Sequence, residues 1–410
     1  MEASVPGGWS ARQWRRVAHG GGERGALVRY ALLLFAVNKA LLVAATLAVS
    51  TSHIRHDRPV GLLHWLFIDN FHFWDANWYV RIARYGYAYD PKGTTFFPLY
   101  PQTMAFVARV THLGLLASGV LIANVCFLGL LYAFLRLTRV DLDLRDTKRV
   151  GWLLALYPTS YYFSAAYTES MFMLWTILVL LALRRKKWAR AGLYGFLAGL
   201  TRNTGVLLAL PFLIELATDV AQRRPTWRQW LHHEAHRLLW VAAVGASGLA
   251  YAAYLWKRFG DPLLFAHNQV YYGRTFLVPW KTLYRGYRFI IGGLVHNSLS
   301  TGWPRYYYPI QLWFVTWVLV VLVTGFRRMR WSYWTIVLYS LVVPLSSPAR
   351  FAADDFFVSF SRYSLVIVPL YYGMYRLLGR SRVAYAAHLA VSAVLFVVLA
   401  AAWSKHAWVA

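Results

Sequence analysis

A carboxylate set among aromatic residues is the first group in the chain that could perform acid–base chemistry. Asp75 follows Trp74, and Trp74, Trp78 and Ile82 recur at a spacing of four residues, which places them on one face of a helix. At the mouth of a membrane cavity, a carboxylate in this position could act as a general base. An interfacial helix that leaves Asp75 in solvent would give the same pattern.

A second carboxylate, Glu169, lies within an apolar run. An ionisable side chain in such a run is costly and is by default a candidate for function. Arg202 and Asn203 interrupt a later apolar run and are natural partners, either for Glu169 or for a phosphate. Pairing with an arginine for packing alone is the alternative interpretation of Glu169.

Further polar side chains suit sugars and phosphates. Gln269 and Arg274 follow the pair Gly260-Asp261, which is typical of a turn. Arg362 should lie on the outer side, against the usual charge bias, and the planar fork of an arginine suits a lipid phosphate. The expected substrate-binding residues are Trp74, Trp78, Arg81, Glu169, Arg202, Asn203, Gln269, Arg274 and Arg362.

Neither a metal nor a cofactor is expected. The 13 histidines show no zinc-binding constellation. The adjacent Asp354 and Asp355 are expected to be solvated rather than to bind a divalent cation. The single cysteine, Cys126, lies in an apolar run, so no disulfide can form within the chain and the thiol is expected to fill the core.

The composition places these residues in a membrane. Of the 410 residues, 59% are hydrophobic and only 14% are charged, well below the roughly 25% charged residues of a soluble domain. The chain carries a net charge of +27. Its cations lie in short clusters between apolar runs, which is the positive-inside pattern and not the basic face of a nucleic-acid-binding domain. These loops are expected to face the cytoplasm and anionic membrane lipids.

The apolar runs predict an all-α polytopic membrane protein with about ten to twelve transmembrane helices. Residues 1–25 form a basic cytoplasmic segment, and residues 26–405 form a single transmembrane domain with no soluble second domain. The first run, 26–50, is too long for a cleaved signal sequence. Two long aromatic loops, 51–97 and 257–305, are expected on the outer side as short helices on the membrane surface.

Two positions in this pattern need an explanation. Runs 150–162 and 191–201 are too short to cross alone, and each is followed at once by a second run, which predicts half-length hairpins around a cavity. If all basic loops lie inside, an odd number of crossings must connect the first long loop to the cluster 141–149, but only two runs are visible there. Either run 98–115 dips in without crossing, or the cluster lies outside.

In order and type, these residues resemble the GPI mannosyltransferase II (PIG-V) family of membrane glycosyltransferases. The resemblance extends from about residue 28 to residue 380. It is carried by Trp74-Asp75 to Gly86-Tyr87, Phe96 to Pro101, Tyr157-Pro158 to Glu169-Ser170, Thr201 to Gly205, Gly260 to Trp280, and Arg362-Tyr363.

The resemblance implies a GT-C glycosyltransferase fold and a polyprenyl-phosphate-linked sugar donor, typically of mannose. It implies a site on the non-cytoplasmic face, with Asp75 as the catalytic residue. In an inverting transfer, Asp75 would take the proton of the acceptor hydroxyl. Arg202, Arg274 or Arg362 would neutralise the leaving phosphate without a metal. The acceptor would be a lipid-linked or cell-surface glycan.

The basic loops and N-terminal segment favour the plasma membrane of a prokaryote over the endoplasmic reticulum, so a GPI precursor is not assumed as acceptor. A partner subunit stays open. A transporter or flippase of a lipid-linked substrate is the alternative from another functional class, since broken helices also line transporter sites. A non-catalytic subunit of a glycan-assembly complex is a further alternative, but it would leave Asp75, Glu169 and Arg362 without a role.

Overall fold

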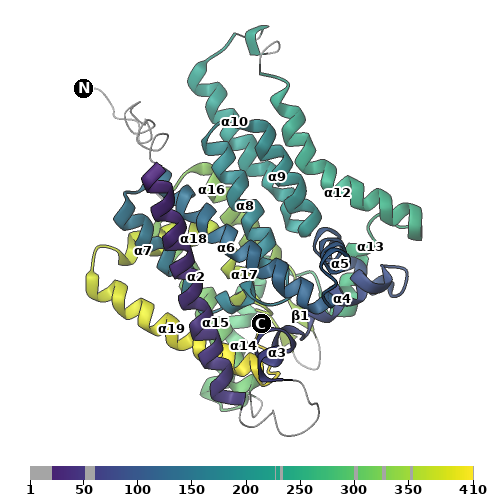
Figure 1. Ribbon diagram of the computed structural model, residues 1–410, viewed down its shortest axis with the longest axis vertical. Helices are drawn as coiled ribbons and strands as arrows, with labels where there is room; N and C mark the ends of the chain where they lie inside the picture. Colours follow the sequence, from purple (N-terminus) through teal and green to yellow (C-terminus); the bar gives the residue numbers. More distant parts are fainter. Residues whose placement is uncertain are drawn as a thin grey trace.

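The computed structural model describes residues 21–50, 61–226, 228–230, 234–299, 303–325, 329–350 and 354–409. Within these ranges the chain is almost entirely helical (Figure 1). The longest helices are α2 (Gly21–Ser50), α6 (Leu115–Asp141), α12 (Arg237–Phe259), α15 (Pro304–Gly325) and α19 (Arg382–Ser404). Those of intermediate length are α4 (Asp75–Tyr85), α5 (Leu99–Thr111), α7 (Leu144–Ala155), α8 (Glu169–Arg184), α9 (Trp188–Thr201), α10 (Ala209–Arg223), α14 (Pro279–Val295), α16 (Trp331–Leu345) and α18 (Val368–Leu378).

Short elements connect these helices. They are α3 (Leu62–Phe67), η1 (Asp69–Phe71), η2 (Pro91–Thr95), η3 (Ser160–Phe163), η4 (Asn203–Leu208), α13 (Leu264–His267), η5 (Asn268–Tyr272), α17 (Phe360–Leu365), and the antiparallel strands β1 (Ala349–Arg350) and β2 (Asp354–Asp355). The described parts of both predicted long loops therefore contain short helices, while residues 51–60 and 300–302 lie outside the described residues. Of the predicted N-terminal segment, residues 1–20 also lie outside, and residues 21–25 already belong to α2.

The expected all-α polytopic architecture is confirmed, with fewer full-length spans than the sequence suggests. Six helical stretches in the described residues are long and apolar enough to cross a membrane: Gly22–Val49, Leu115–Asp141, Asn203–Arg223, Arg237–Phe259, Arg305–Gly325 and Arg382–Ser404. The other predicted spans are shorter helices, from the 11 residues of α18 to the 16 of α8. A straight helix needs about 20 residues to cross, so each of these is too short to cross alone.

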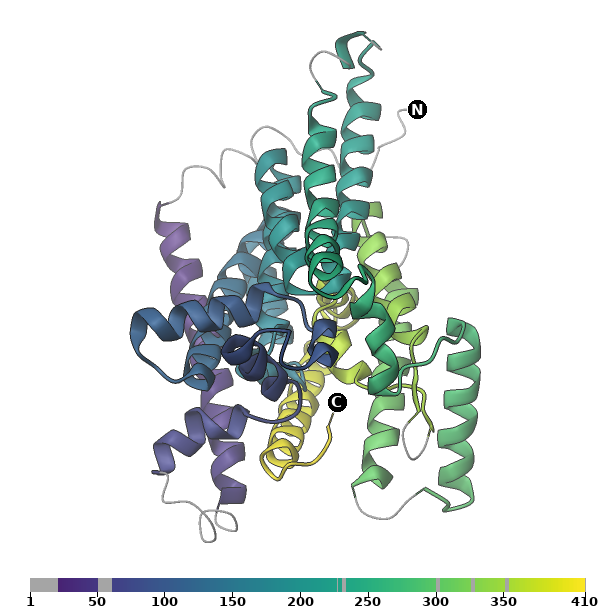
Figure 2. The ribbon, with the colours of Figure 1, turned by 90° about the vertical axis from the view of Figure 1, so that its right-hand side faces the viewer.

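Within the described residues, the basic clusters gather at one end of the molecule, which we call the basic end. Arg184 binds Asp141 at 2.6 Å, Arg330 binds Glu215 at 2.9 Å, and Arg149 donates to the carbonyl of Gly379 at 2.9 Å. These contacts join the ends of α6, α7, α8, α10, α16 and α18. The α10–α12 pair projects beyond the other helices here (Figures 1 and 2).

Contacts at the basic end decide between the two alternatives predicted for the chain between the first long loop and the cluster 141–149. Arg139, near the C-terminus of α6, forms an ion pair with Glu23, near the N-terminus of α2. Helix α6 therefore returns to the side from which α2 starts. Helix α5 has 13 residues and does not cross. Of the two predicted alternatives, the structure supports the one in which run 98–115 dips in.

The first predicted break separates α7 from α8. Residues 156–168 are buried throughout although most of them are not helical. Asn38 of α2 and Ser160 both donate to the carbonyl oxygen of Ala155 that the end of α7 leaves without a helical partner. Irregular backbone at membrane depth is stable only when it is enclosed by protein in this way. The N-terminal half of α7 and the C-terminus of α8 both lie at the basic end, so the two helices form a hairpin, as predicted.

The second predicted break separates α9 from η4 and α10. The helix ends at Thr201, Arg202 is extended, and the chain turns back, so that Lys186 before α9 forms an ion pair with Asp219 of α10. The turn is tight: a Cβ on Gly205 would lie 2.2 Å from the carbonyl oxygen of Ala198. Glycine is therefore required at position 205 for the close approach that places Arg202 at the tip of the hairpin.

Candidate active site

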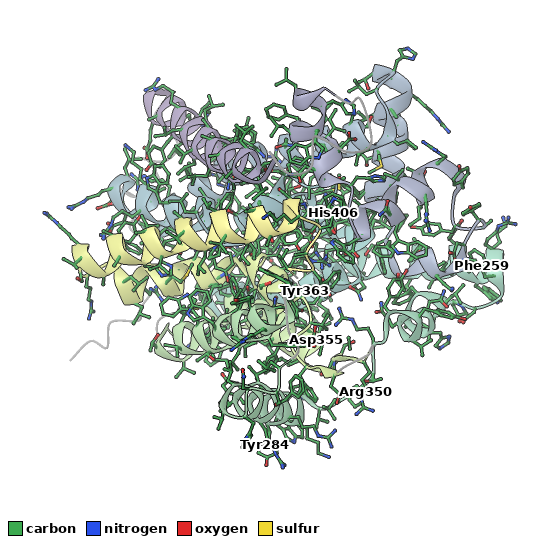
Figure 3. All side chains as sticks on the ribbon, turned by 90° about the horizontal axis from the view of Figure 1, so that it is seen from below. Phe259, Tyr284, Arg350, Asp355, Tyr363 and His406 are labelled. Atoms are coloured by element: carbon green, nitrogen blue, oxygen red, sulfur yellow. The ribbon has the colours of Figure 1, made fainter. Side chains whose placement is uncertain are left out.

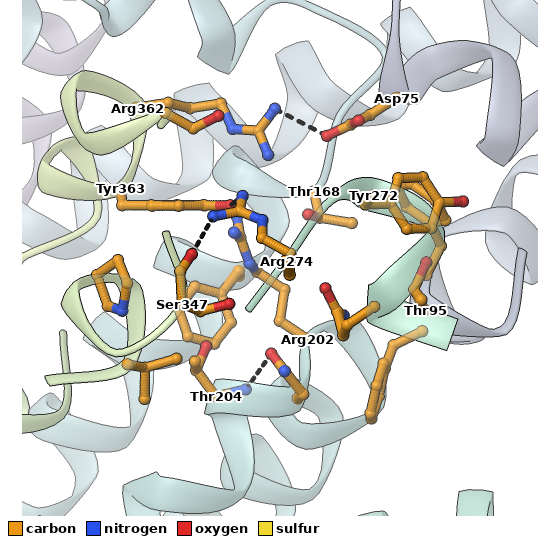
Figure 4. A pocket seen from close by; sticks show the side chains of 18 of the residues that line it. Asp75, Thr95, Thr168, Arg202, Thr204, Tyr272, Arg274, Ser347, Arg362 and Tyr363 are labelled. Carbon is orange, nitrogen blue, oxygen red and sulfur yellow. Dashed lines mark hydrogen bonds and ion pairs between the residues drawn. The ribbon is translucent and has the colours of Figure 1, made fainter. Parts of the chain in front are cut away.

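The broken helices and both long loops enclose a cavity of about 340 Å³ away from the basic end. Its polar wall contains Asp75, Arg202, Arg274 and Arg362 (Figure 4). An apolar wall is formed by Phe172 of α8, by Tyr339, Val343 and Pro344 of α16, and by Val366. Aromatic residues of the long loops, including Phe96, Phe265 and Tyr272, line the other side. The cavity thus combines a charged centre with apolar surface, as sites for amphipathic ligands do.

Asp75 is the first residue of α4, which agrees with the predicted helix. Trp74 before it has a positive φ of 55°, so the chain turns sharply into the helix. The hydroxyl of Tyr167 donates to the carbonyl of Phe73 and accepts from the amide of Asp75, at 3.0 and 3.2 Å. The N-terminus of a helix also favours an anion. These contacts fix the position of Asp75 on the cavity wall.

Arg362 of α17 joins the two predicted carboxylates. Its Nη1 donates to Oδ2 of Asp75 at 2.7 Å, and its Nε lies 3.2 Å from Oε1 of Glu169. The side chain is buried, with 9% of its surface exposed. The guanidinium lies over the rings of Tyr162, Tyr167 and Tyr363, at 5.3 to 5.8 Å from their centroids. Cation–π contacts of this kind stabilise a desolvated cation.

Glu169 is the first residue of α8 and is only 1% exposed. Its Oε1 also accepts from Nη1 of Arg202 at 2.7 Å, so the predicted pairing of Glu169 with Arg202 is observed. Glu169 is not among the residues that line the cavity. Its geometry is that of a counter-ion for two arginines rather than of a group in contact with substrate.

Arg274 completes the cationic group. Its Nη1 donates to the carbonyl of Ser347 at 2.7 Å and its Nη2 to the hydroxyl of Tyr363 at 2.8 Å. Three guanidinium groups, of Arg202, Arg274 and Arg362, surround the Tyr363 ring, each within 6 Å of its centroid (Figure 4). These three cations face two carboxylates, which leaves an excess of one positive charge beside the cavity. An anionic group in the cavity would be stabilised there.

The structure brings together most of the predicted binding residues. Asn203 and Gln269 line the cavity with the arginines. Trp74, Trp78 and Arg81 do not line it: Trp78 stacks on Phe96, with centroids 5.8 Å apart, and the exposed Arg81 lies over the Trp78 ring. Trp74 and Trp78 pack instead against residues that do line it, Trp408 in the case of Trp74 and Phe96 in the case of Trp78.

Several lining residues were absent from the sequence prediction. Tyr79 lies one helical turn after Asp75 and hydrogen-bonds Thr168 at 3.3 Å, so helical spacing from Asp75 could have identified it. Tyr272 and Ser347 come from distant segments. So does Trp408, near the end of the chain, and no local sequence signal marks these three.

The predicted solvation of Asp354 and Asp355 holds for only one of the pair. Asp354 forms an exposed ion pair with Arg350, whereas Asp355 is buried and accepts from the Tyr307 hydroxyl at 2.9 Å and the amide of Phe357. The hairpin places alternate side chains on opposite faces, which the sequence pair alone does not reveal. Burial raises the pKa of Asp355 to about 6. In the described residues no cluster of three or more His, Cys, Asp or Glu side chains could hold a metal.

Residues 28–272 match the sequence profile of a family described as mannosyltransferase (PIG-V). Among solved structures, the crystal structure of ArnT from Cupriavidus metallidurans bound to undecaprenyl phosphate is similar. It has a TM-score of 0.41 and 13% sequence identity, over 91% of this chain and 77% of that chain. No curated protein sequence matches the chain. The profile match includes Asp75, Glu169 and Arg202 and ends before Arg274.

Proposed function

The chain belongs to the mannosyltransferase (PIG-V) family and is a membrane glycosyltransferase, and we propose that it transfers mannose from a polyprenyl-phosphate donor to a lipid-linked or cell-surface glycan. The observation that carries this proposal is the meeting of Asp75 with three arginines at one cavity. A base for the acceptor and cations for the leaving phosphate are the two requirements of such a transfer. A transporter or flippase would not account for the family.

In the proposed reaction, Asp75 takes the proton of an acceptor hydroxyl. The hydroxyl oxygen bonds to the anomeric carbon of the donor sugar from the face opposite the phosphate. The bond between that carbon and the phosphate oxygen breaks, its electron pair stays on the phosphate, and the anomeric configuration inverts. The ion pair with Arg362 is made by Oδ2 of Asp75. We assign proton transfer to Oδ1.

The leaving phosphate is assigned to Arg202, Arg274 and Arg362. Their excess positive charge supports this assignment, because the phosphate gains charge as the sugar departs. The apolar wall formed by α8 and α16 suits the polyprenyl chain. That wall includes Phe172, Tyr339 and Val343 and adjoins Arg202 in the cavity lining.

The proposed side of the membrane is the non-cytoplasmic face. The cavity lies away from the basic end, and basic loops are retained in the cytoplasm. A polyprenyl-phosphate donor displayed in the outer leaflet could then reach the site from the lipid. The plasma membrane of a prokaryote is the proposed location, because the basic clusters follow the charge bias of such membranes.

The test is sugar transfer by the purified protein in lipid, with polyprenyl-phosphate-[¹⁴C]mannose and a total lipid extract from the source organism. Label should move into a new lipid with the wild type. Asp75→Asn should fold normally, since Arg362 keeps Glu169 as a partner, and should lose about 10²- to 10⁴-fold in rate, the usual contribution of a general base. Asp69→Asn is the matched control, because that carboxylate is more exposed and pairs with His64 outside the cavity.

Full transfer by Asp75→Asn would remove Asp75 as the base. Transfer of another sugar but not of mannose would replace the proposed donor. Absence of any transfer by the wild type, with intact protein and both substrates supplied, would contradict the proposed reaction. Accessibility of Asp75→Cys to an impermeant thiol reagent from the cytoplasmic side alone would contradict the proposed face.

A further inference from the structure

The segment that follows α19 turns back towards the cavity. His406 has a positive φ of 61° just after the helix ends at Ser404, and Figure 3 shows it at the end of α19. Trp408 lines the cavity two residues later. Val409 is 1% exposed, so this segment is packed into the protein.

The segment is held by hydrogen bonds from two other parts of the chain. Nε1 of Trp303 donates to the carbonyl of Trp408 at 2.6 Å. Nε2 of Gln311 donates to the carbonyl of Val409 at 3.2 Å, and the same Gln311 accepts from the amide of Ser361 at 2.9 Å. Ser361 immediately precedes Arg362. The backbone of the segment is thus fixed relative to the arginine that binds Asp75.

The side chain of Trp408 packs against the residue that precedes Asp75. The Trp408 and Trp74 rings meet edge-on, with centroids 4.7 Å apart. Trp408 is half-buried, so part of its surface is free for a ligand. A rigid aromatic ring fixed beside the proposed base provides an apolar surface at low entropic cost. The carbon–hydrogen face of a pyranose ring is flat and apolar enough to pack against it.

We propose that Trp408 is the platform on which the sugar ring of the acceptor lies during transfer. This inference rests on the proposed function, in which Asp75 takes the proton of the acceptor hydroxyl. The hydroxyl must lie at Asp75, and the ring that bears it then lies beside Trp74 and Trp408. The polyprenyl chain has its own apolar wall at α16.

The experiment uses the full-length protein in lipid nanodiscs, with polyprenyl-phosphate-[¹⁴C]mannose as donor and octyl α-mannoside as acceptor probe. KM is measured separately for donor and acceptor. Trp408→Ala should raise the KM for octyl mannoside about tenfold or more, the effect of losing roughly one good aromatic contact. It should change the KM for the donor much less. Trp408→Phe should recover most of the acceptor affinity because it restores a ring.

Trp280→Ala is the control, since this tryptophan is 68% exposed on α14 and lies outside the cavity lining. Equal rises in both KM values, or a Phe variant as impaired as the Ala variant, would overturn the platform role. A KM for octyl mannoside that Trp408→Ala leaves unchanged would also overturn the platform role. Octanol used as efficiently as octyl mannoside would also overturn it, because octanol has no sugar ring to pack on Trp408.

Release of free mannose from the donor, measured without acceptor, separates the two proposals. Wild-type protein that hydrolyses the donor but neither uses octyl mannoside nor is inhibited by it would overturn the acceptor inference alone. Protein that neither hydrolyses the donor nor transfers its sugar would contradict the proposed function itself.

Discussion

Replacing Glu169 by glutamine tests whether this carboxylate holds the cationic group together. Glu169 is 1% exposed, lies 2.7 Å from Arg202 and 3.2 Å from Arg362, and has no place in the cavity lining. Glutamine keeps the shape and one oxygen but removes the charge. Arg202 then has no carboxylate partner, and Arg362 keeps only Asp75. Removing one member of a buried ion pair costs about 3–5 kcal/mol.

That loss should appear as a lower unfolding temperature. At about 2 °C per kcal/mol for a chain of this size, Glu169→Gln should unfold roughly 6–10 °C below the wild type. The assay is thermal unfolding of the purified protein in detergent, followed by intrinsic fluorescence. Glu23→Gln is the control, because the Glu23–Arg139 pair at the basic end is partly exposed and should contribute no more than about 1 kcal/mol.

A polyprenyl phosphate should partly replace the missing charge. With Glu169→Gln, three arginines face Asp75 alone, so the variant should gain more stability from a polyprenyl phosphate than the wild type does. The uncharged polyprenol should not reproduce this gain. An unfolding temperature within about 2 °C of the wild type, or equal stabilisation of both proteins by the phosphate, would refute the counter-ion assignment.

Two further substitutions probe the elements around the site. Gly205→Ala should destabilise the protein by about 2–3 kcal/mol and reduce transfer, because the added Cβ would lie 2.2 Å from the backbone of Ala198. Thermal unfolding measures the loss of stability. Gly245→Ala is the control and should not destabilise, because no atom lies within 4 Å of its added carbon. Asp355 has a pKa raised to about 6 by burial in spite of its hydrogen bond from Tyr307, so the folded protein retains its proton at a pH where the unfolded chain has lost it. Wild-type stability should therefore fall by about 3 kcal/mol between about pH 3 and pH 7 relative to Asp355→Asn, and parallel pH profiles would contradict this.

The helical elements were largely predictable because their signals are local. The runs that became α6, α12 and α19 are apolar enough to be identified without tertiary information. The break at Arg202-Asn203 follows from polar residues that interrupt an apolar run. Asp75 at the start of α4 follows from the spacing of its aromatic neighbours. In each case, residues within a few positions of one another determine the backbone.

Contacts between distant segments were not predictable. Trp74, Trp78 and Arg81 were expected at the substrate because of their types, but they are not part of the cavity lining, and the two tryptophans pack against residues that are. The short α5 was ambiguous until the Glu23–Arg139 pair fixed the ends of α2 and α6. Hydropathy gives the length of a run, whereas the side on which it ends depends on what it packs against.

The sequence by itself determined that this protein is a membrane enzyme of the PIG-V type. It also predicted that the basic loops share one side of the membrane, and it identified Asp75 and Glu169 as candidate functional carboxylates. Only the tertiary structure decided which groups meet. Arg362 binds Asp75 across 287 positions of sequence, and Trp408 reaches Trp74 from near the other end of the chain. Such pairs depend on the packing of whole helices, and no local pattern of residue types encodes that packing.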